Sequence, residues 1–388
     1  MPNKEPIRVV VAGGGSGGHV YPVLAVLEAL GKLFGELDAP LEVTRVGPRD
    51  GYEALFENHG IKVASIVGAK LRRYFSIANV IDGPKFFIAL FQALFKLYFI
   101  MPDVIFSKGG TSALPVVIAG WFYRIPIVIH ESDSRPGLTN LASSHFAKKV
   151  FLSFASATKY FNAKKTEVIG TPIRGELFSD RTTKNLAKDA LGFSSSNPLL
   201  LVLGGSQGSR RINDFILENL STLAKDTQIL HQTGIPNLAE AQKLSRAALI
   251  DESFRNRYQP VGYFENNLSM ALTASDLVIA RAGSNTIAEL AAFGLPAILI
   301  PLTESANDHQ RTNAYEFAKA GAGVVIEEVN LLPGIFLPQV RTILSDQNLR
   351  AKMSVASAQF FVSGAAERIA QELVTLAVRV GSAGQKPA

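Results

Sequence analysis

The amino-acid sequence predicts an α/β protein with two domains, each built on a doubly wound parallel sheet. An apolar run at 7–12 leads directly into the glycine-rich segment 13–18, and a second apolar run at 199–203 leads into a similar segment at 204–208. Strand-like and helix-like runs alternate around both loops, which is typical of parallel sheets with crossover helices. A glycine loop between a strand and a helix lets the backbone approach an anion, which the free N–H groups of the helix then face. One such loop in each half predicts two nucleotide-type domains that face each other across a cleft.

Length and composition agree with this organisation. The 388 residues are enough for two domains of roughly 100–200 residues each. The formal net charge is only +6 and the Lys and Arg residues are scattered, so we expect no nucleic-acid partner and only weak attraction to acidic partners. The chain contains no Cys, which excludes disulfides, thiolate zinc sites and cysteine nucleophiles. The N-terminal residues lack the apolar segment of a signal peptide, so we expect a cytosolic protein.

In the first half, apolar and β-branched runs predict strands separated by segments of helix length. The helix that follows the first glycine loop is expected from about Pro22, because proline is tolerated in the first turn of a helix. The predicted strands are 7–12, 41–46, 61–67, 104–106, 127–130 and 150–154.

The second half repeats the alternation after an interruption at 170–198. This segment contains Thr171-Pro172, Gly175 and a Ser-rich stretch before Pro198, and we expect it to form the hinge between the domains followed by a surface loop. Helical runs close the chain, and a frayed tail is expected at its C-terminus. The predicted strands are 199–203, 228–232, 277–280, 297–300 and 323–326, and the predicted tail is 381–388.

The helix-like run 85–101 is unusually apolar. Its polar members, Lys85, Gln92 and Lys96, fall within a stripe roughly 40° wide on a helical projection. One interpretation is a helix buried between the sheet and a neighbouring element. The other adds the basic and aromatic segment 71–75 and predicts attachment to an anionic membrane surface. A transmembrane span is disfavoured, because the run is shorter than about 20 residues and contains a lysine.

The first glycine loop could bind a dinucleotide or could border a catalytic site that contains His19. Gly13, Gly15 and Gly18 satisfy the dinucleotide pattern G-x-G-x-x-G, which would require an acidic residue at the end of the next strand to hold a ribose. That strand ends with the sequence TRVG at 44–47, and no acid follows until Asp50. His19 follows the glycines at the junction of loop and helix, where we expect it to act as a catalytic base.

The segment 276–289 carries the richest polar constellation of the second half. A predicted strand ends at Arg281, and the helix that opens at 283–286 could hold a diphosphate through its backbone N–H groups and hydroxyls. Glu289, one turn further, could accept hydrogen bonds from a ribose diol. An ordinary Ser cap with a glutamate near the helix start would explain Ser284 and Glu289 but not Arg281. The polar cluster 308–313 could then bind sugar hydroxyls.

The acidic residues and histidines do not form a pattern typical of a metal site. The six histidines are dispersed, and the nearest approach to an acidic clamp is Glu131-Ser132-Asp133. We therefore expect neither a bound metal nor another cofactor.

Motifs that carry a family resemblance run in order along nearly the whole chain. They are GGSGGHV at 14–20, KGG at 108–110, HE at 130–131, PGLTN at 136–140, GTPIR at 170–174, GGSQG at 204–208, HQTG at 231–234, RAGSNTIAE at 281–289, and DHQ at 308–310 with Asn313. With these motifs the chain resembles the MurG family, peripheral membrane glycosyltransferases that add N-acetylglucosamine (GlcNAc) to lipid I and so form lipid II for peptidoglycan.

The resemblance implies the GT-B architecture of two Rossmann-like domains. Residues 1–172 would form the acceptor- and membrane-associated domain and 173–362 the UDP-sugar domain, with a last helix at about 363–380 packed back on the first domain. It implies an inverting transfer of GlcNAc from UDP-GlcNAc to the C4 hydroxyl of N-acetylmuramic acid in undecaprenyl-pyrophosphoryl-MurNAc-pentapeptide, which is lipid I. The expected partners are these substrates, an anionic membrane surface and other cell-wall synthesis proteins. The expected location is the cytoplasmic face of the bacterial membrane.

By motif position, the resemblance also implies roles for individual residues. Ser284, Asn285, Thr286 and Glu289 would line the phosphates and ribose, the backbone near Phe264 and Glu265 would contact uracil, and Gln310 would contact the sugar. Ser206 and Arg174 would approach the donor, with Arg281 near its diphosphate, while Ser16, Gly17, Gly18 and His19 would lie on the acceptor side together with Asp133.

The chain departs from the family pattern at two positions of its first half. Ser132-Asp133 stands where the family usually has Gln-Asn, and Thr111-Ser112 stands where an aromatic residue commonly follows KGG. A glycosyltransferase of the same architecture with another lipid acceptor therefore remains an alternative. The others are a UDP-sugar epimerase and a non-catalytic subunit that binds lipid-linked sugars.

Overall fold

The computed structural model describes residues 6–36, 39–68, 77–110, 112–179, 182–205, 207–249, 251–264, 267–305 and 308–384. The chain forms two compact units: unit 1 comprises Met1–Arg174 and Val362–Ala388, and unit 2 comprises Gly175–Phe361. The basic segment 71–75 and two expected site residues, Ser206 and Glu265, lie outside the described residues.

Unit 1 is built on a seven-stranded parallel sheet with the order β3-β2-β1-β4-β5-β6-β7. The order reverses beside β1, which pairs with β2 on one side and with β4 on the other. The strands are β1 Ile7–Gly14, β2 Leu41–Gly47, β3 Lys62–Ser65, β4 Val104–Gly110, β5 Ile127–Glu131, β6 Lys149–Leu152 and β7 Thr166–Val168.

Helices cover both faces of this sheet because successive strand residues point to opposite sides. Val9 and Val11 of β1 pack against α1 (Gly17–Glu36), α2 (Glu53–Asn58) and α17 (Ala365–Gly384). Val10 and Ala12 pack on the other face against α3 (Ile77–Ile100) and α4 (Ala113–Phe122). The remaining helical segments of unit 1 are α5 Leu138–Ser144, η1 Ala155–Tyr160 and η2 Ala163–Lys165.

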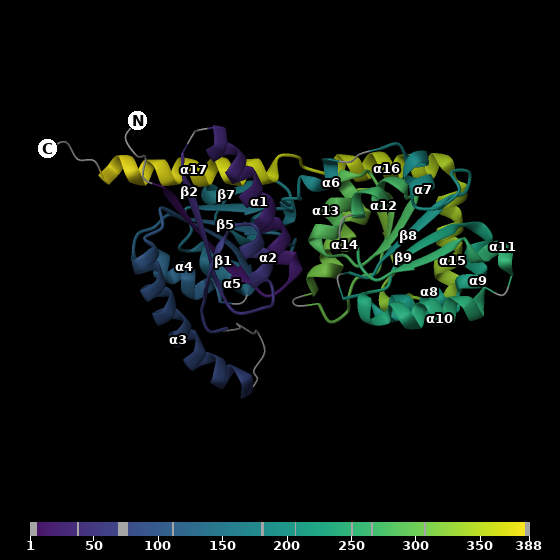
Figure 1. The fold of residues 1–388 in the computed structure, drawn as a ribbon, viewed down its shortest axis with the longest axis horizontal. Coiled ribbons are helices and arrows are strands. Elements are labelled where there is room, and N and C mark those ends of the chain that lie inside the picture. Colours follow the sequence, from purple (N-terminus) through teal and green to yellow (C-terminus); the bar gives the residue numbers. More distant parts are fainter. Residues whose placement is uncertain are drawn as a thin grey trace. The chain divides into compact units, whose positions relative to one another are not determined.

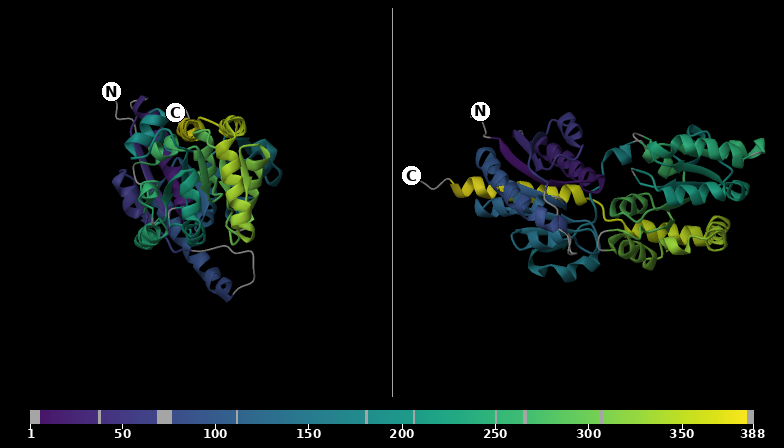
Figure 2. Two further views of the ribbon diagram at one scale, coloured as in Figure 1. Left: turned by 90° about the vertical axis from the view of Figure 1, so that its right-hand side faces the viewer. Right: turned by 90° about the horizontal axis from the view of Figure 1, so that it is seen from below.

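The last helix, α17, returns to the unit formed by the start of the chain. Figures 1 and 2 show it in yellow along unit 1, and it packs against α1 and β4. Its Arg368 donates two hydrogen bonds of 2.8 Å from Nε and Nη2 to the Glu167 carboxylate of β7. Such a paired contact fixes the relative orientation of the guanidinium and the carboxylate and also balances their charges. It therefore holds α17 at the edge of the sheet.

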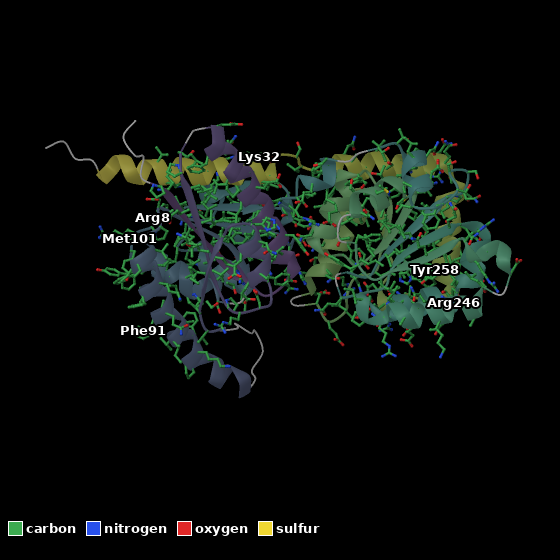
Figure 3. All side chains as sticks on the ribbon, in the orientation of Figure 1. Arg8, Lys32, Phe91, Met101, Arg246 and Tyr258 are labelled. Carbon is green, nitrogen blue, oxygen red and sulfur yellow. The ribbon has the colours of Figure 1, made fainter. Side chains whose placement is uncertain are left out.

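Helix α3 is mostly exposed between Gly83 and Ile100, so the interpretation of a helix buried between the sheet and a neighbouring element is wrong. Ala89, Ala93 and Leu97 form its buried stripe in the core, while Phe91, labelled in Figure 3, is 70% exposed. The other exposed aromatic residues of α3 are Phe87, Phe95, Tyr98 and Phe99, and Trp121 and Phe122 are exposed at the end of α4. We call these seven residues the aromatic surface set.

Within the described residues, the window Gly83–Ile100 of α3 is long and apolar enough to cross a membrane by length and composition alone. Only 17% of it is buried. It therefore differs from a core helix of a soluble protein, which would be mostly buried.

Unit 2 repeats the same plan with a six-stranded parallel sheet in the order β10-β9-β8-β11-β12-β13. The strands are β8 Leu199–Leu203, β9 Gln228–Gln232, β10 Tyr258–Val261, β11 Leu277–Ala280, β12 Ala297–Leu299 and β13 Gly323–Val325. The helices are α6 Glu176–Ser179, α7 Lys184–Ala190, α8 Arg210–Glu218, α9 Leu220–Asp226, α10 Leu238–Ala248, α11 Glu252–Arg255, α12 Leu268–Ala274, α13 Ser284–Ala292, α14 His309–Lys319, α15 Pro333–Ser345 and α16 Gln347–Phe360, with η3 Ile235–Asn237 and η5 Glu328–Asn330.

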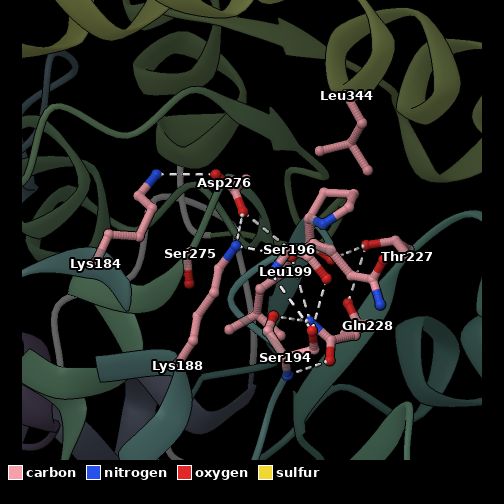
Figure 4. A network of polar contacts seen from close by, with 12 residues as sticks. Lys184, Lys188, Ser194, Ser196, Leu199, Thr227, Gln228, Ser275, Asp276 and Leu344 are labelled. Atoms are coloured by element: carbon pink, nitrogen blue, oxygen red, sulfur yellow. Dashed lines mark hydrogen bonds and ion pairs between the residues drawn. The ribbon is translucent and has the colours of Figure 1, made fainter. Parts of the chain in front are cut away.

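A buried ion network anchors α7 to the amino-terminal edge of the unit 2 sheet (Figure 4). Asp276, just before β11, accepts hydrogen bonds from Lys184 at 2.9 Å, from Lys188 at 2.7 Å and from the N–H of Leu199 at 2.9 Å. Burial opposes ionisation of this carboxyl, but the two lysines outweigh burial and lower the pKa of Asp276. The network therefore fixes the start of β8 and β11 at the edge opposite the second glycine loop.

Three expectations about local structure are wrong. Helix α1 begins at Gly17, directly after the loop, so Pro22 lies inside it and not in its first turn. Segment 170–198 contains α6 and α7 where a surface loop was expected. The predicted tail is helical up to Gly384.

Candidate functional site

Both glycine loops lie at the point where the strand order of their sheet reverses. In open α/β sheets this point leaves a crevice beyond the carboxyl ends of the strands, where ligands bind. In unit 1 it lies between β1 and β4, and in unit 2 between β8 and β11. Sequence positions far apart are thereby brought to the same edge of each sheet.

The first loop and His19 form a compact group at the end of β1. Gly13 and Gly14 pair with Gly109 and Gly110 of β4. A β-carbon at Gly110, where φ is +84°, would lie 2.4 Å from the Gly14 carbonyl oxygen and 3.5 Å from Cε1 of His19. The His19 ring thus rests against a position that tolerates only glycine.

Ser16 fixes the orientation of the His19 ring. The Ser16 hydroxyl lies 3.0 Å from Nδ1 of His19, and the Ser16 carbonyl accepts the His19 N–H at 3.0 Å. When Nδ1–H donates to this hydroxyl, Nε2 carries the lone pair of the neutral ring. The half-exposed His19 can then present a proton acceptor at the loop.

A buried polar cluster lies at the carboxyl ends of β4 and β5, at the same edge of the sheet. Lys108 is 2% exposed and its ammonium group donates to the Ser132 hydroxyl. The Glu131 carboxylate accepts hydrogen bonds from the N–H groups of Asp133 and Gly137 at 2.9 and 3.1 Å. Burial lowers the pKa of Lys108 to about 8, and burial together with the nearby Asp133 charge raises the pKa of Glu131. The half-buried Asp133 therefore interacts with a lysine and a glutamate whose pKa values burial shifts in favour of the neutral forms.

His130 and Arg174, two further residues of the first half, make contacts that stabilise the structure around the site. His130 is fully buried with Nε2 3.0 Å from the Gly170 carbonyl oxygen, and burial lowers its pKa well below the usual value, so the ring is neutral. The Arg174 guanidinium lies 4.5 Å from the centre of the Tyr21 ring of α1. Arg174 thus stacks on the helix that carries His19.

In unit 2 the helix α13 begins where an anion site was expected. Its N-cap is Gly283 in extended conformation, and no side chain caps the helix. Ser284 is therefore the first helical residue, so the interpretation of an ordinary Ser cap is wrong. The first-turn N–H groups have no acceptor within the helix, and Thr286 and Glu289 are half-buried on its first two turns.

Arg281 is held by a buried carboxylate that sequence reasoning missed. Its Nη2 donates to a Glu328 carboxylate oxygen and, at 2.7 Å, to the Ser209 hydroxyl, and its Nη1 donates to the Ile300 carbonyl at 3.1 Å. Thr303 donates to the other Glu328 oxygen. Burial opposes ionisation of Glu328, but its hydrogen bonds with Thr303 and Arg281 outweigh burial and lower its pKa. Glu328, which follows β13, thus connects the segments that follow β11 and β12. Through Arg281 and Ser209 it also connects the segment that follows β8.

The other expected residues of unit 2 lie around the same edge. Gln310 is on the first turn of α14, where its Oε1 accepts the Leu302 N–H at 3.0 Å. The buried Asn313 donates to the Ala282 carbonyl at 3.4 Å and so connects α14 with the turn before α13. Phe264 is 6% exposed and packs in the core, which leaves only its backbone for a ligand. Among the residues that the structure describes, no group of three or more His, Asp or Glu could hold a metal.

Comparisons with known proteins decide the family. Residues 9–152 match the model of the glycosyltransferase family 28 N-terminal domain, and residues 199–369 match that of the C-terminal domain. The UDP-N-acetylglucosamine–N-acetylmuramyl-(pentapeptide) pyrophosphoryl-undecaprenol N-acetylglucosamine transferase 2 of Bacillus cereus is 38% identical over 326 residues, covering 83% of this chain and 87% of the relative. The transferase of that name from Clostridium kluyveri is 36% identical over 91% of this chain and 96% of its own. The chain belongs to the MurG family.

Solved structures place the MurG-family chain among GT-B proteins. The crystal structure of Acinetobacter baumannii MurG has a TM-score of 0.74 and 26% identity, covering 95% of this chain and all of the other. A UDP-GlcNAc 2-epimerase from Neisseria meningitidis has a TM-score of 0.65 and 13% identity, covering 95% of this chain and 100% of its own. That likeness shows a shared fold of two parallel-sheet α/β domains and no more.

Proposed function

We propose that this chain transfers GlcNAc from UDP-GlcNAc to the C4 hydroxyl of MurNAc in lipid I and so produces lipid II. The observation that carries the proposal is similarity over most of the chain to transferases named for this reaction. The site geometry supports it, because each sheet carries a glycine loop at its reversal point.

Unit 2 holds the donor in this proposal. The first N–H groups of α13 bind the diphosphate, since a helix N-terminus stabilises negative charge. Glu289 accepts hydrogen bonds from the ribose, and Asn285 lines the phosphates and ribose beside it. Gln310 contacts the sugar, and the backbone around 264–265 contacts the base. The Arg281 charge is balanced by Glu328, so Arg281 acts mainly by fixing the turn that precedes α13. Ser206 approaches the donor from the second glycine loop.

Unit 1 holds the acceptor and supplies the base. Nε2 of His19 takes the proton from the C4 hydroxyl as the new bond between this oxygen and the anomeric carbon of GlcNAc forms. The bond from the anomeric carbon to the UDP oxygen breaks with inversion, and UDP leaves with the electron pair. Ser16 holds Nδ1 of the ring, while Gly17, Gly18 and Asp133 border the acceptor. Arg174, which stacks on the Tyr21 ring, approaches the donor. No metal takes part in these steps.

The aromatic surface set attaches the enzyme to the membrane in which its lipid acceptor resides. Exposed aromatic side chains favour the interfacial region of a bilayer, and Lys85 and Lys96 on the same helix favour anionic lipid. We place the enzyme at the cytoplasmic face of the membrane as a peripheral protein, in reach of other cell-wall synthesis proteins.

Transfer of labelled sugar from UDP to extracted lipid I tests the proposed function. We expect lipid-linked product with UDP-GlcNAc, little with UDP-glucose or UDP-galactose, and the same rate with excess EDTA. Equal use of the three donors would contradict the role of Gln310. Loss of turnover in EDTA that magnesium restores would contradict the metal-independent reaction.

A further inference from the structure

We propose that Asp50, held by the buried Arg45, is a positioning residue that sets the conformation of the glycine loop leading to His19. The inference rests on the proposed function, in which His19 takes the acceptor proton. It concerns residues that follow β2, whereas the loop follows β1.

A buried cation lies directly beneath this loop. Arg45, near the end of β2, is 1% exposed, and its guanidinium lies 4.9 Å from the centre of the Phe56 ring. Its Nη2 forms an ion pair with the Asp50 carboxylate and a 3.3 Å hydrogen bond with the Pro48 carbonyl. Nε and Nη1 are buried without a hydrogen-bond partner among the described residues. A cation so poorly satisfied depends on its counter-charge, and Asp50 supplies it.

The same Asp50 oxygen also binds the loop. Oδ2 accepts the Gly15 N–H at 2.8 Å. A β-carbon at Gly14 would lie 2.3 Å from this oxygen and 2.4 Å from Nη2 of Arg45, so the ion pair is in direct contact with the loop backbone. The Gly15 N–H is therefore directed toward the protein and not toward a ligand. Ser16, the next residue, holds Nδ1 of His19.

Asp50 is itself fixed by the turn in which it lies. The Glu53 carboxylate accepts the N–H groups of Asp50 and Gly51 at 2.8 and 3.0 Å. The Tyr52 N–H donates to Oδ1 of Asp50 at 3.2 Å. Hydrogen bonds within the segment 48–53 thus hold Asp50 in place, and a shift of the loop would break the contact between Asp50 and Gly15.

The position of a base governs rate more than substrate affinity, since a displacement of about 1 Å can reduce turnover roughly 10²-fold. Removing the Asp50 acceptor should therefore lower kcat for transfer and leave the KM for UDP-GlcNAc unchanged, because unit 2 holds the donor. A residue with only a structural role would instead lower the amount of folded protein and leave the kcat of the folded fraction unchanged.

Two double variants compare Asp50 with and without its acceptor oxygens. Arg45→Met with Asp50→Asn removes both charges and keeps an amide oxygen for the Gly15 N–H. Arg45→Met with Asp50→Leu also removes both charges, and its side chain of similar size has no acceptor for the N–H groups of Gly15 and Tyr52. Neither variant leaves a lone buried charge, and the unmodified chain, assayed in parallel, reports on the proposed function itself.

We expect the Asp50→Leu double variant to have a kcat lower by about tenfold or more than the Asp50→Asn double variant, with equal KM for UDP-GlcNAc. Equal kcat values per folded molecule would overturn the inference while transfer by the unmodified chain upholds the proposed function. Amide hydrogen exchange gives a second test that needs neither a variant nor activity. Slow exchange at Gly15 is expected, and exchange at the rate of a free amide would overturn the inference.

Discussion

At the scale of single residues, the proposed chemistry depends most on His19. Its Nδ1 is held by Ser16 at 3.0 Å, and in the proposed reaction Nε2 takes the acceptor proton. We expect His19→Ala to lower kcat by roughly 10²–10⁴, the usual contribution of a general base, with unchanged affinity for UDP-GlcNAc by calorimetry. A variant that raised only the KM for lipid I would show a positional role.

Asp133→Asn is the matched comparison, because it replaces a carboxylate at the same edge of the sheet by the amide usual in the family. We expect it to keep most of its turnover at saturating acceptor. If Asp133→Asn loses turnover and His19→Ala retains it, the base has been assigned to the wrong residue.

His231 also makes the stability of the folded chain depend on pH in the acid range. His231 in β9 is fully buried, with Nε2 3.1 Å from Oδ1 of Asn213 and Nδ1 3.0 Å from the Tyr258 hydroxyl. Burial lowers the pKa of His231 to about 3. Between pH 6.5 and 3 the unfolded chain therefore binds a proton that the folded chain does not, so stability falls as the pH falls through this window.

His231→Phe removes this proton uptake. As pH falls from 6 to 5, we expect the free energy of unfolding of unit 2 to decline less steeply in the variant, by up to about 1.4 kcal/mol per pH unit. Hydrogen exchange of the β9 amides measures this free energy of unfolding at each pH. Parallel pH profiles of the two proteins would show that His231 is protonated in the folded state.

The residues that sequence reasoning missed act through contacts between distant positions. Glu328 binds Arg281, 47 positions earlier, and Asp50 binds Gly15, 35 positions earlier. Asp50 follows a strand of mixed polarity, and Glu328 is the second of two adjacent acids after β13. Neither pattern carries a periodic or motif signal. The glycine loops and the 281–289 segment could be predicted because their chemistry lies within one continuous stretch.

At the scale of elements, the structure chooses between the two interpretations of α3. Phe87 and Phe91 are 62% and 70% exposed, whereas Gln92 of the polar stripe is half-buried and accepts the Val67 N–H at 2.7 Å. An apolar helix face so exposed favours contact with a membrane or another apolar surface. Sequence pattern alone could not decide this, because it does not show which side of a helix is covered.

We expect the purified protein to bind anionic vesicles reversibly and more weakly at high salt, because screening removes only the electrostatic part of the contact. Replacing Phe87 and Phe91 with Ser should weaken flotation with vesicles by roughly tenfold or more, since each buried ring contributes about 1.5–3 kcal/mol. Ile235→Ser, at a position of unit 2 that is 68% exposed, is the control. Unchanged flotation of the double variant would contradict attachment through α3. Replacing Arg72 and Arg73, in the segment 71–75 outside the described residues, with Glu should also release the protein from the vesicles.

The predicted strands are confirmed near the centre of both sheets, whereas one edge strand of each sheet was not predicted. β7 and β10 were missed, and both lie at the end of their sheet order. β10 contains Pro260 and β7 contains Glu167. Edge strands tolerate such residues because one side needs no partner, so their sequences lack the apolar run that identifies a central strand.

At the scale of the whole molecule, the two units share one topology and therefore place their loops in equivalent positions. The fold alone does not decide the reaction, since UDP-GlcNAc 2-epimerases of 13–15% identity share it. The family assignment rests on sequence similarity over most of the chain. What separates the two reactions is the fate of the sugar: a transferase moves it to an acceptor, and an epimerase returns it to UDP with one centre inverted.

The fate of UDP-[¹⁴C]GlcNAc incubated with the enzyme, in the presence and absence of lipid I, therefore tests most directly whether the enzyme is a transferase. We expect label in the lipid extract, as a disaccharide on the lipid diphosphate with inverted anomeric configuration, only when lipid I is present. Without lipid I, we expect to recover unchanged UDP-GlcNAc. Conversion of UDP-GlcNAc to its 2-epimer without any lipid acceptor, and no label in lipid when lipid I is added, would show that the enzyme is not this transferase.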